Sequence, residues 1–362
     1  MKRIALLGLA LFLLFVLILV NLPLSGEHWR MSDFANTFYR VGQNLFWGNN
    51  VYLSAYPHPT NERNYPPFAP IWVWYAFMTF AAYPLPVAQT MRLVLDVLGL
   101  PFMVYLTVRW ARLYDLRKVL LLGLAPWLII QVESGQITPL VFIGVLLCYW
   151  GVRRASPAIT AMGLWLVLIK FTLVSLIIGA TVLFAWRRKI LGRTLAILGT
   201  LIVIASLPHP TWWLDLGQLY YERLTHPRLA DSVLLLPGYP WAQLSLLIFA
   251  ALAFLIYFWR SNVMQPSRWL WAMLVGVSLV GALHTFVYDW QLLMLPLALL
   301  FQSRLGIGLT IVLYLYVFAW AIFSLGLNIP IPSPALIPAV TMLALLAWQL
   351  TSRATWNKYE TL

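Results

Sequence analysis

Long apolar runs recur from one end of the chain to the other, and they constrain the fold more than any other feature of the sequence. Many reach about 17 to 25 residues, the length that an α-helix needs to cross the hydrocarbon core of a bilayer. Only 10% of the 362 residues are charged and the mean hydropathy is +0.82, which excludes an ordinary soluble domain. Backbone polar groups inside lipid must pair within the chain, and a helix satisfies them within each segment. The sequence therefore predicts an all-α polytopic membrane protein.

We expect a single integral membrane domain, residues 1–362, with about twelve transmembrane helices. The first apolar run follows Met1-Lys2-Arg3 and has the charge pattern of a signal peptide, but no clear cleavage site follows it, so an uncleaved helix is the better interpretation. The expected helices cover residues 4–22, 88–108, 119–132, 137–152, 157–169, 171–186, 190–208, 240–259, 269–283, 289–302, 306–326 and 334–351.

The net charge of +13 reports on membrane orientation. Basic residues beside membrane-spanning helices tend to stay in the cytoplasm. Most of the 24 Lys and Arg fall in every second turn of the predicted helix order, as at Arg153-Arg154 and Arg187-Arg188, and few acids accompany them. This distribution predicts a multi-pass cell-membrane protein with both termini in the cytoplasm. It also argues against nucleic acid as a partner, because the positive charge is divided among short turns.

Two sizeable loops are expected on the extracytoplasmic face, at residues 23–87 and 209–238. Within the first loop, segment 67–83 is apolar, but a crossing there would invert every later basic turn. Its Trp, Tyr and Pro content is typical of the membrane–water interface. We therefore interpret it as an interfacial or re-entrant segment that does not cross.

Asp33 is the one acid in the polar stretch from Trp29 to Pro59. It follows Ser32, a good helix N-cap, and begins a predicted amphipathic helix that Gly48 ends. Such a helix is expected to lie on the membrane surface and to hold its first turn at the lipid–water boundary. Two interpretations stay open at this point: a capping carboxylate without chemistry, or a catalytic group. The apolar face of this helix consists of Phe34, Phe38, Val41 and Leu45.

Lys170 lies between two short apolar runs, midway between two basic turns. An ammonium group among Ile169 and Phe171 is costly unless an anion accompanies it, which favours a functional role, and a lipid phosphate would serve as that anion. The alternative is a side chain that extends to water.

Further polar residues fall at predicted outer helix ends, each with a structural alternative as a cap or turn residue. No HxH or HExxH pattern occurs, so we expect no metal site and no cofactor, although a divalent ion held by carboxylates is a remaining alternative. These further candidate binding residues are Tyr65, Arg92, Gln136, His284 and Asp289.

Taken in order, these segments resemble glycosyltransferase family 87, the polyprenyl-phosphate-dependent mannosyltransferases of the C-type glycosyltransferase fold. The resemblance covers most of the chain between Asp33 and Asp289. Each motif is short, and their order carries the resemblance. After Asp33, they are "WGNNVY", "NYPPFAP", "SGQITP", Lys170 and "HTFVYDW".

The resemblance implies an inverting hexosyltransferase that takes a sugar, mannose in this family, from a polyprenyl-phosphate donor to an extracytoplasmic lipid or glycan acceptor. Asp33 would be the general base that accepts the acceptor's hydroxyl proton. Related enzymes often carry paired acids there; Phe34 follows here, which favours the metal-free version. Cations would stabilise the leaving phosphate. The implied phosphate-binding residues are Lys170, Arg92 and His284, and those for the sugar and head group are Tyr65, Gln136 and Asp289.

Two other function classes are compatible with the sequence. A multi-helix transporter also places polar residues at membrane depth, but normally near the midplane of broken helices. A lipid-linked glycan polymerase or ligase shares the substrates and is not distinguished by these motifs. Membrane lipids are expected neighbours in every case.

Overall fold

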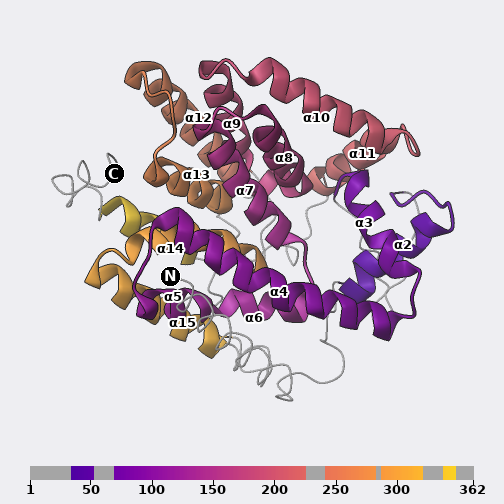
Figure 1. The fold of residues 1–362 in the computed structure, drawn as a ribbon, viewed down its shortest axis with the longest axis horizontal. Coiled ribbons are helices and arrows are strands. Elements are labelled where there is room, and N and C mark those ends of the chain that lie inside the picture. Colours follow the sequence, from indigo (N-terminus) through magenta and orange to yellow (C-terminus); the bar gives the residue numbers. More distant parts are fainter. Residues whose placement is uncertain (1–33, 53–68, 226–240, 283–286, 321–336, 348–362) are drawn as a thin grey trace.

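The computed structural model describes residues 34–52, 69–225, 241–282, 287–320 and 337–347, and every regular element in these ranges is a helix (Figure 1). The all-α class is therefore confirmed for the described residues. η1 is a π-helix, and η2 and η4 are 3₁₀-helices. The elements are η1 Phe34–Phe38, α2 Tyr39–Phe46, α3 Ile71–Ala81, α4 Leu85–Ala111, α5 Leu116–Gly123, α6 Pro126–Ser134, α7 Thr138–Arg153, α8 Pro157–Val167, η2 Leu168–Leu173, α9 Ser175–Arg187, α10 Leu191–Ser206, α11 Trp212–Thr225, α12 Trp241–Ser261, α13 Arg268–Gly281, η4 Val287–Leu293, α14 Met294–Leu300 and α15 Arg304–Trp320, followed by the helix Ile337–Ala347.

Two of these helices, α4 and α12, are long and apolar enough to cross a membrane, by length and composition. Only 17% of the apolar window of α12 is buried, and Phe249, Ile256 and Trp259 are exposed on it. A core helix of a soluble protein would bury such side chains, whereas a large exposed apolar surface suits lipid or a partner. The structure thus supports association with a membrane.

The expectation of about twelve full-length crossings is not reproduced in the described part of the chain. The other apolar helices there are 10–17 residues long. Local sequence interrupts several predicted segments. The expected helix 119–132 is two helices, because Pro126 has no N–H and fits only the first turn, so α5 ends and α6 begins at this point. The expected helix 289–302 is the 3₁₀-helix η4 followed by α14, and the expected loop 209–238 contains α11.

The apolar face expected next to Asp33 is buried against α3 and does not face lipid. The Phe38 ring stacks on Phe77 at a centroid distance of 4.7 Å, and Phe34 contacts Phe80 edge-on at 5.5 Å. The end of the helix is as expected, since Gly48 adopts a φ of 77° directly after it. α3 has 11 residues, about 16 Å at 1.5 Å per residue, and is too short to cross the core alone. The interfacial placement of 67–83 stays a prediction.

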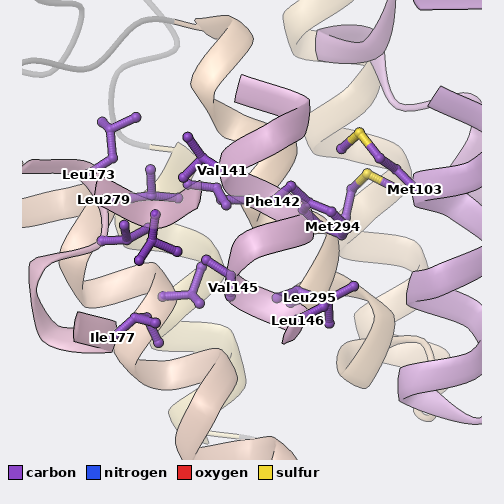
Figure 2. Packing of buried hydrophobic residues seen from close by; sticks show 14 of the residues in the cluster. Met103, Val141, Phe142, Val145, Leu146, Leu173, Ile177, Leu279, Met294 and Leu295 are labelled. Atoms are coloured by element: carbon purple, nitrogen blue, oxygen red, sulfur yellow. The ribbon is translucent and has the colours of Figure 1, made fainter. Parts of the chain in front are cut away.

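α7 lies at the centre of the bundle. Figure 2 shows Val145 of α7 beside Ile177 of α9, and Phe142 directed toward Met103 of α4 and Met294 of α14. All of these side chains are fully buried. α7 therefore holds together two groups of helices that Figure 1 shows on either side of it.

α7 and α8 pack through glycines, as helices do where backbones approach closely. A Cβ atom on Gly163 would lie 2.5 Å from the backbone nitrogen of Cys148. By contrast, a Cβ on Gly179 of α9 would meet nothing within 4 Å.

We expect Gly163→Ala to lower the free energy of unfolding by about 1–3 kcal/mol, because the added methyl group must displace a helix backbone. Gly179→Ala is the matched control and should be neutral or stabilising by up to about 1 kcal/mol, since alanine is the better helix former. The unfolding midpoints of the purified variants in one detergent check this. Equal midpoints for the two variants would contradict the close α7–α8 contact.

Candidate functional site

The candidate site is built around the break between α6 and α7. Gly135 ends α6 in the left-handed conformation, with a φ of 67°, which glycine adopts without strain. This turn directs the Gln136 carbonyl back toward two buried donors. Arg92 Nη2 and Gln131 Nε2 each donate to that carbonyl at 2.5 Å. The break therefore supplies a buried acceptor and places Thr138 at the start of α7.

Lys170 and Asp289 form an ion pair at this break. Lys170 Nζ donates to Asp289 Oδ1 at 2.8 Å and to Thr138 Oγ1 at 3.2 Å, and the Thr138 hydroxyl donates to Asp289 Oδ1 at 2.7 Å. The Asp289 side chain is fully buried, and that of Lys170 is 15% exposed. The triangle joins η2, η4 and the first turn of α7.

The backbone at Lys170 departs from helical geometry. Its φ of −134° and ψ of 61° interrupt η2 between α8 and α9. The expected division of the chain into two short helices at this residue is thus correct in outline. The anionic partner that the sequence leaves open is the carboxylate of Asp289, 119 residues away, where a lipid phosphate was the example expected.

A second buried ion pair lies on the other side of the break. Arg92 and Asp96 are one turn apart on α4, and the guanidinium binds the carboxylate through two bonds, Nε to Oδ2 at 3.1 Å and Nη2 to Oδ1 at 2.8 Å. Gln131 Nε2 lies 3.5 Å from Asp96 Oδ1, and Gln291 Nε2 donates to Gln131 Oε1 at 2.6 Å.

The two ion pairs belong to one network, because the same segments serve both. α6 supplies Gln131 and the α6–α7 break supplies the Gln136 carbonyl to one pair, the start of α7 supplies Thr138 to the other, and η4 supplies Gln291 and Asp289. We call this network the polar junction. It consists of Arg92, Asp96, Gln131, Gln136, Thr138, Lys170, Asp289 and Gln291.

The polar junction is energetically demanding. Desolvating two charges costs several kcal/mol for each ion, and their attraction offsets that cost only where the geometry and the extra hydrogen bonds are good. Ionisable groups inside an apolar helical protein are rare and usually mark a pathway or a site. The junction is therefore the strongest candidate site in the described part of the chain.

Four residues singled out from the sequence, Arg92, Gln136, Lys170 and Asp289, come together in the polar junction. The sequence predicted that the Gln136 side chain would form the hydrogen bonds. In the structure, the backbone carbonyl of Gln136 accepts the hydrogen bonds from Arg92 and Gln131. Three others, Asp33, Tyr65 and His284, lie outside the described residues.

Sequence reasoning missed four members of the junction: Asp96, Gln131, Thr138 and Gln291. Asp96 had the clearest signal, since residues four apart on a helix face each other and Arg92 precedes it by four. Gln291 follows Asp289 by two residues on an interrupted helix, and no simple spacing rule places it inward.

The two predicted outer loops contact each other. Asn50 Nδ2 donates to Asp215 Oδ2 at 3.1 Å, and His209 Nε2 lies 3.2 Å from the same oxygen. Trp72 of α3 stacks on Trp165 of α8 at 4.3 Å. The first predicted loop therefore contacts both the second predicted loop and α8, the helix that precedes Lys170.

Among the residues that the structure describes, no group of three His, Cys, Asp or Glu side chains could hold a metal ion. Comparison of the chain with protein-family models, with curated proteins and with solved structures finds no match. The argument for function therefore rests on the chain's own residues.

We expect Lys170→Met and Asp289→Asn each to lower the free energy of unfolding by about 3–5 kcal/mol, because each leaves a buried charge without its partner. The double variant Lys170→Met/Asp289→Asn should lose much less than the sum, since no charge is left buried. Unfolding midpoints of the purified variants provide the test. A double variant that loses the full sum would show that the pair is not coupled.

Proposed function

We propose that the chain is a membrane glycosyltransferase that transfers a hexose, mannose by family expectation, from a polyprenyl-phosphate donor to an extracytoplasmic lipid or glycan acceptor. The observation that supports it best is the polar junction: Lys170 and Arg92 reach one buried network from separate helices in a chain that exposes many large apolar side chains. A substrate with a phosphate head and a hydrocarbon tail matches buried cations beside apolar helices.

In the proposed arrangement, the chain is a multi-pass protein of about twelve crossings, some made of two short helices in series. Both termini are cytoplasmic. α7 offers support for the sidedness, because it begins in the polar junction at Thr138 and ends at the basic pair Arg153-Arg154. Basic helix ends favour the cytoplasm, which supports an extracytoplasmic position for the junction.

In the proposed reaction, Lys170 and Arg92 stabilise the charge that develops on the departing polyprenyl phosphate, and His284 is a further candidate for this role. Their carboxylate partners, Asp289 and Asp96, hold these cations in position before the substrate arrives. A cation fixed in advance costs no reorganisation when the charge develops.

The acceptor side of the proposed reaction rests on Asp33 as general base. Its carboxylate takes the hydroxyl proton as the acceptor oxygen attacks the anomeric carbon with inversion, and the sugar–phosphate bond breaks. Because the leaving group is a phosphate, no acid is needed to protonate it. Tyr65, Gln136 and Asp289 hold the sugar and the head group. No metal or other cofactor takes part.

A transporter is the second candidate. Lys170 lies in the 3₁₀ segment between α8 and α9, Asp289 lies in the 3₁₀ segment that leads into α14, and polar residues at helix breaks are typical of transporter binding sites. A lipid-linked glycan polymerase or ligase would use the same donor chemistry with a longer glycan.

We expect Asp33→Asn to reduce turnover by about 10²-fold or more while the protein still binds the donor, because only the proton acceptor is lost. The assay supplies polyprenyl-phosphate-mannose in detergent with membrane lipids and follows polyprenyl phosphate release together with labelled product. Arg304→Gln, at the exposed start of α15, is the matched control with unchanged turnover.

Either of two results would contradict the proposal. Full turnover by Asp33→Asn would move the base elsewhere. No turnover of any polyprenyl-linked sugar by the unaltered protein, together with solute uptake when it is reconstituted in vesicles, would favour the transporter.

A further inference from the structure

The end of α7 opposite the polar junction contains a second feature, centred on Tyr149. The Tyr149 ring contacts Trp110 of α4 edge-on and Trp271 of α13 at a tilt, both at a centroid distance of 5.8 Å. All three rings are buried. These ring contacts therefore hold the end of α4, the end of α7 and the start of α13 together.

Three arginines lie at the ends of the same three helices, close to these aromatic rings. Arg112 ends α4 two residues after Trp110, and Arg153 ends α7 one turn after Tyr149. Arg153 Nη1 donates to the Tyr149 hydroxyl at 2.8 Å. Arg268, the first residue of α13, interacts with the same hydroxyl and with the positive charges of Arg112 and Arg153. We call Arg112, Arg153 and Arg268 the arginine cluster.

No carboxylate of the described residues forms an ion pair with the arginine cluster. Asp115, the described acid that follows Arg112 most closely in sequence, accepts from the backbone N–H of Arg117 at 2.9 Å and caps α5. Three neighbouring guanidinium groups repel one another, and Arg268 also lies at a helix N-terminus, where a cation is unfavourable. The fold thus holds concentrated positive charge without a matching anion in the described chain.

A fourth arginine beside the cluster has an unmet hydrogen-bonding group. Arg188 Nη2 lies 3.5 Å from the Arg153 carbonyl oxygen, while its Nε is buried and has no partner among the described residues. A buried donor without an acceptor is costly, and a bound anion is one group that would satisfy it.

We propose that the arginine cluster binds the phosphate of an anionic phospholipid head group. Guanidinium groups bind phosphate oxygens through paired N–H donors, and basic pockets between membrane helices take anionic head groups. Exposed apolar side chains on α4, including Phe102 and Tyr105, offer a surface for the acyl chains. The inference depends on a membrane location and not on sugar transfer, so the two proposals fail independently.

The test measures lipid retention by native mass spectrometry of the purified protein, titrated with phosphatidylglycerol or with phosphatidylcholine. We expect phosphatidylglycerol to bind at least about 10-fold more tightly than phosphatidylcholine. The reason is that only the lipid with a net negative charge balances the positive charge of the three arginines. Arg268→Gln should weaken its binding about 3- to 10-fold and Arg268→Lys by less, because lysine keeps the charge and loses the paired donors.

Arg304→Gln is the matched control. Like Arg268, Arg304 follows a serine that caps its helix: Ser267 accepts from the Leu270 N–H at 3.1 Å and Ser303 from the Gly306 N–H at 2.9 Å. Its loss should leave lipid binding unchanged. Unfolding midpoints identify variants that fail to fold, and Arg153→Gln then replaces Arg268→Gln.

Three outcomes would overturn the proposal. The first is equal affinity for the two lipids. The second is equal loss of binding in Arg304→Gln and Arg268→Gln. The third is that inorganic phosphate alone binds with the same dependence on Arg268 and displaces the lipid at equal concentration, which would assign the site to a free anion.

Discussion

The triangle of Lys170, Asp289 and Thr138 is the interaction on which the rest of the structure depends. It joins residues up to 151 positions apart in the sequence. These residues lie on helical segments that carry few other polar groups. A charged triangle with one arrangement restricts which segments meet, in addition to close packing contacts such as those between α7 and α8. That the pair specifies the fold is a hypothesis for this chain. The triangle lies where η2 separates α8 from α9 and where α7 begins.

α7 connects this triangle with the rest of the molecule. Its first residue, Thr138, belongs to the polar junction, and its last turn carries Arg153. Its 16 residues span about 24 Å, which approaches the thickness of a bilayer core. Close glycine contacts with α8 and packed aliphatic side chains hold the middle of α7 rigid. One helix therefore keeps a buried polar site and an arginine-rich end at a fixed separation.

Sequence reasoning reached the helical class and the importance of Lys170 because hydropathy and the cost of a buried charge are local properties. It did not reach the partner of Lys170, since Asp289 is far along the chain and only tertiary packing brings it close. The division at Pro126 was available from local rules but was hidden by the continuous apolar run around it. Asp96 was not among the residues predicted from the sequence, although Arg92 lies one turn before it on the same helix. The length of a run indicates burial in lipid or protein and does not fix one uninterrupted helix.

The central claim is that the polar junction and the basic end of α7 lie at opposite faces of a membrane. The chain has one cysteine, Cys148, and it is buried, so a Cys148→Ala background allows single reporter cysteines. We would place them at the exposed positions Asn49 and Tyr114 and label intact cells with a membrane-impermeant maleimide. The account predicts that Asn49→Cys is labelled in intact cells and Tyr114→Cys only after permeabilisation. Labelling of both positions in intact cells, or the reverse pattern, would contradict it.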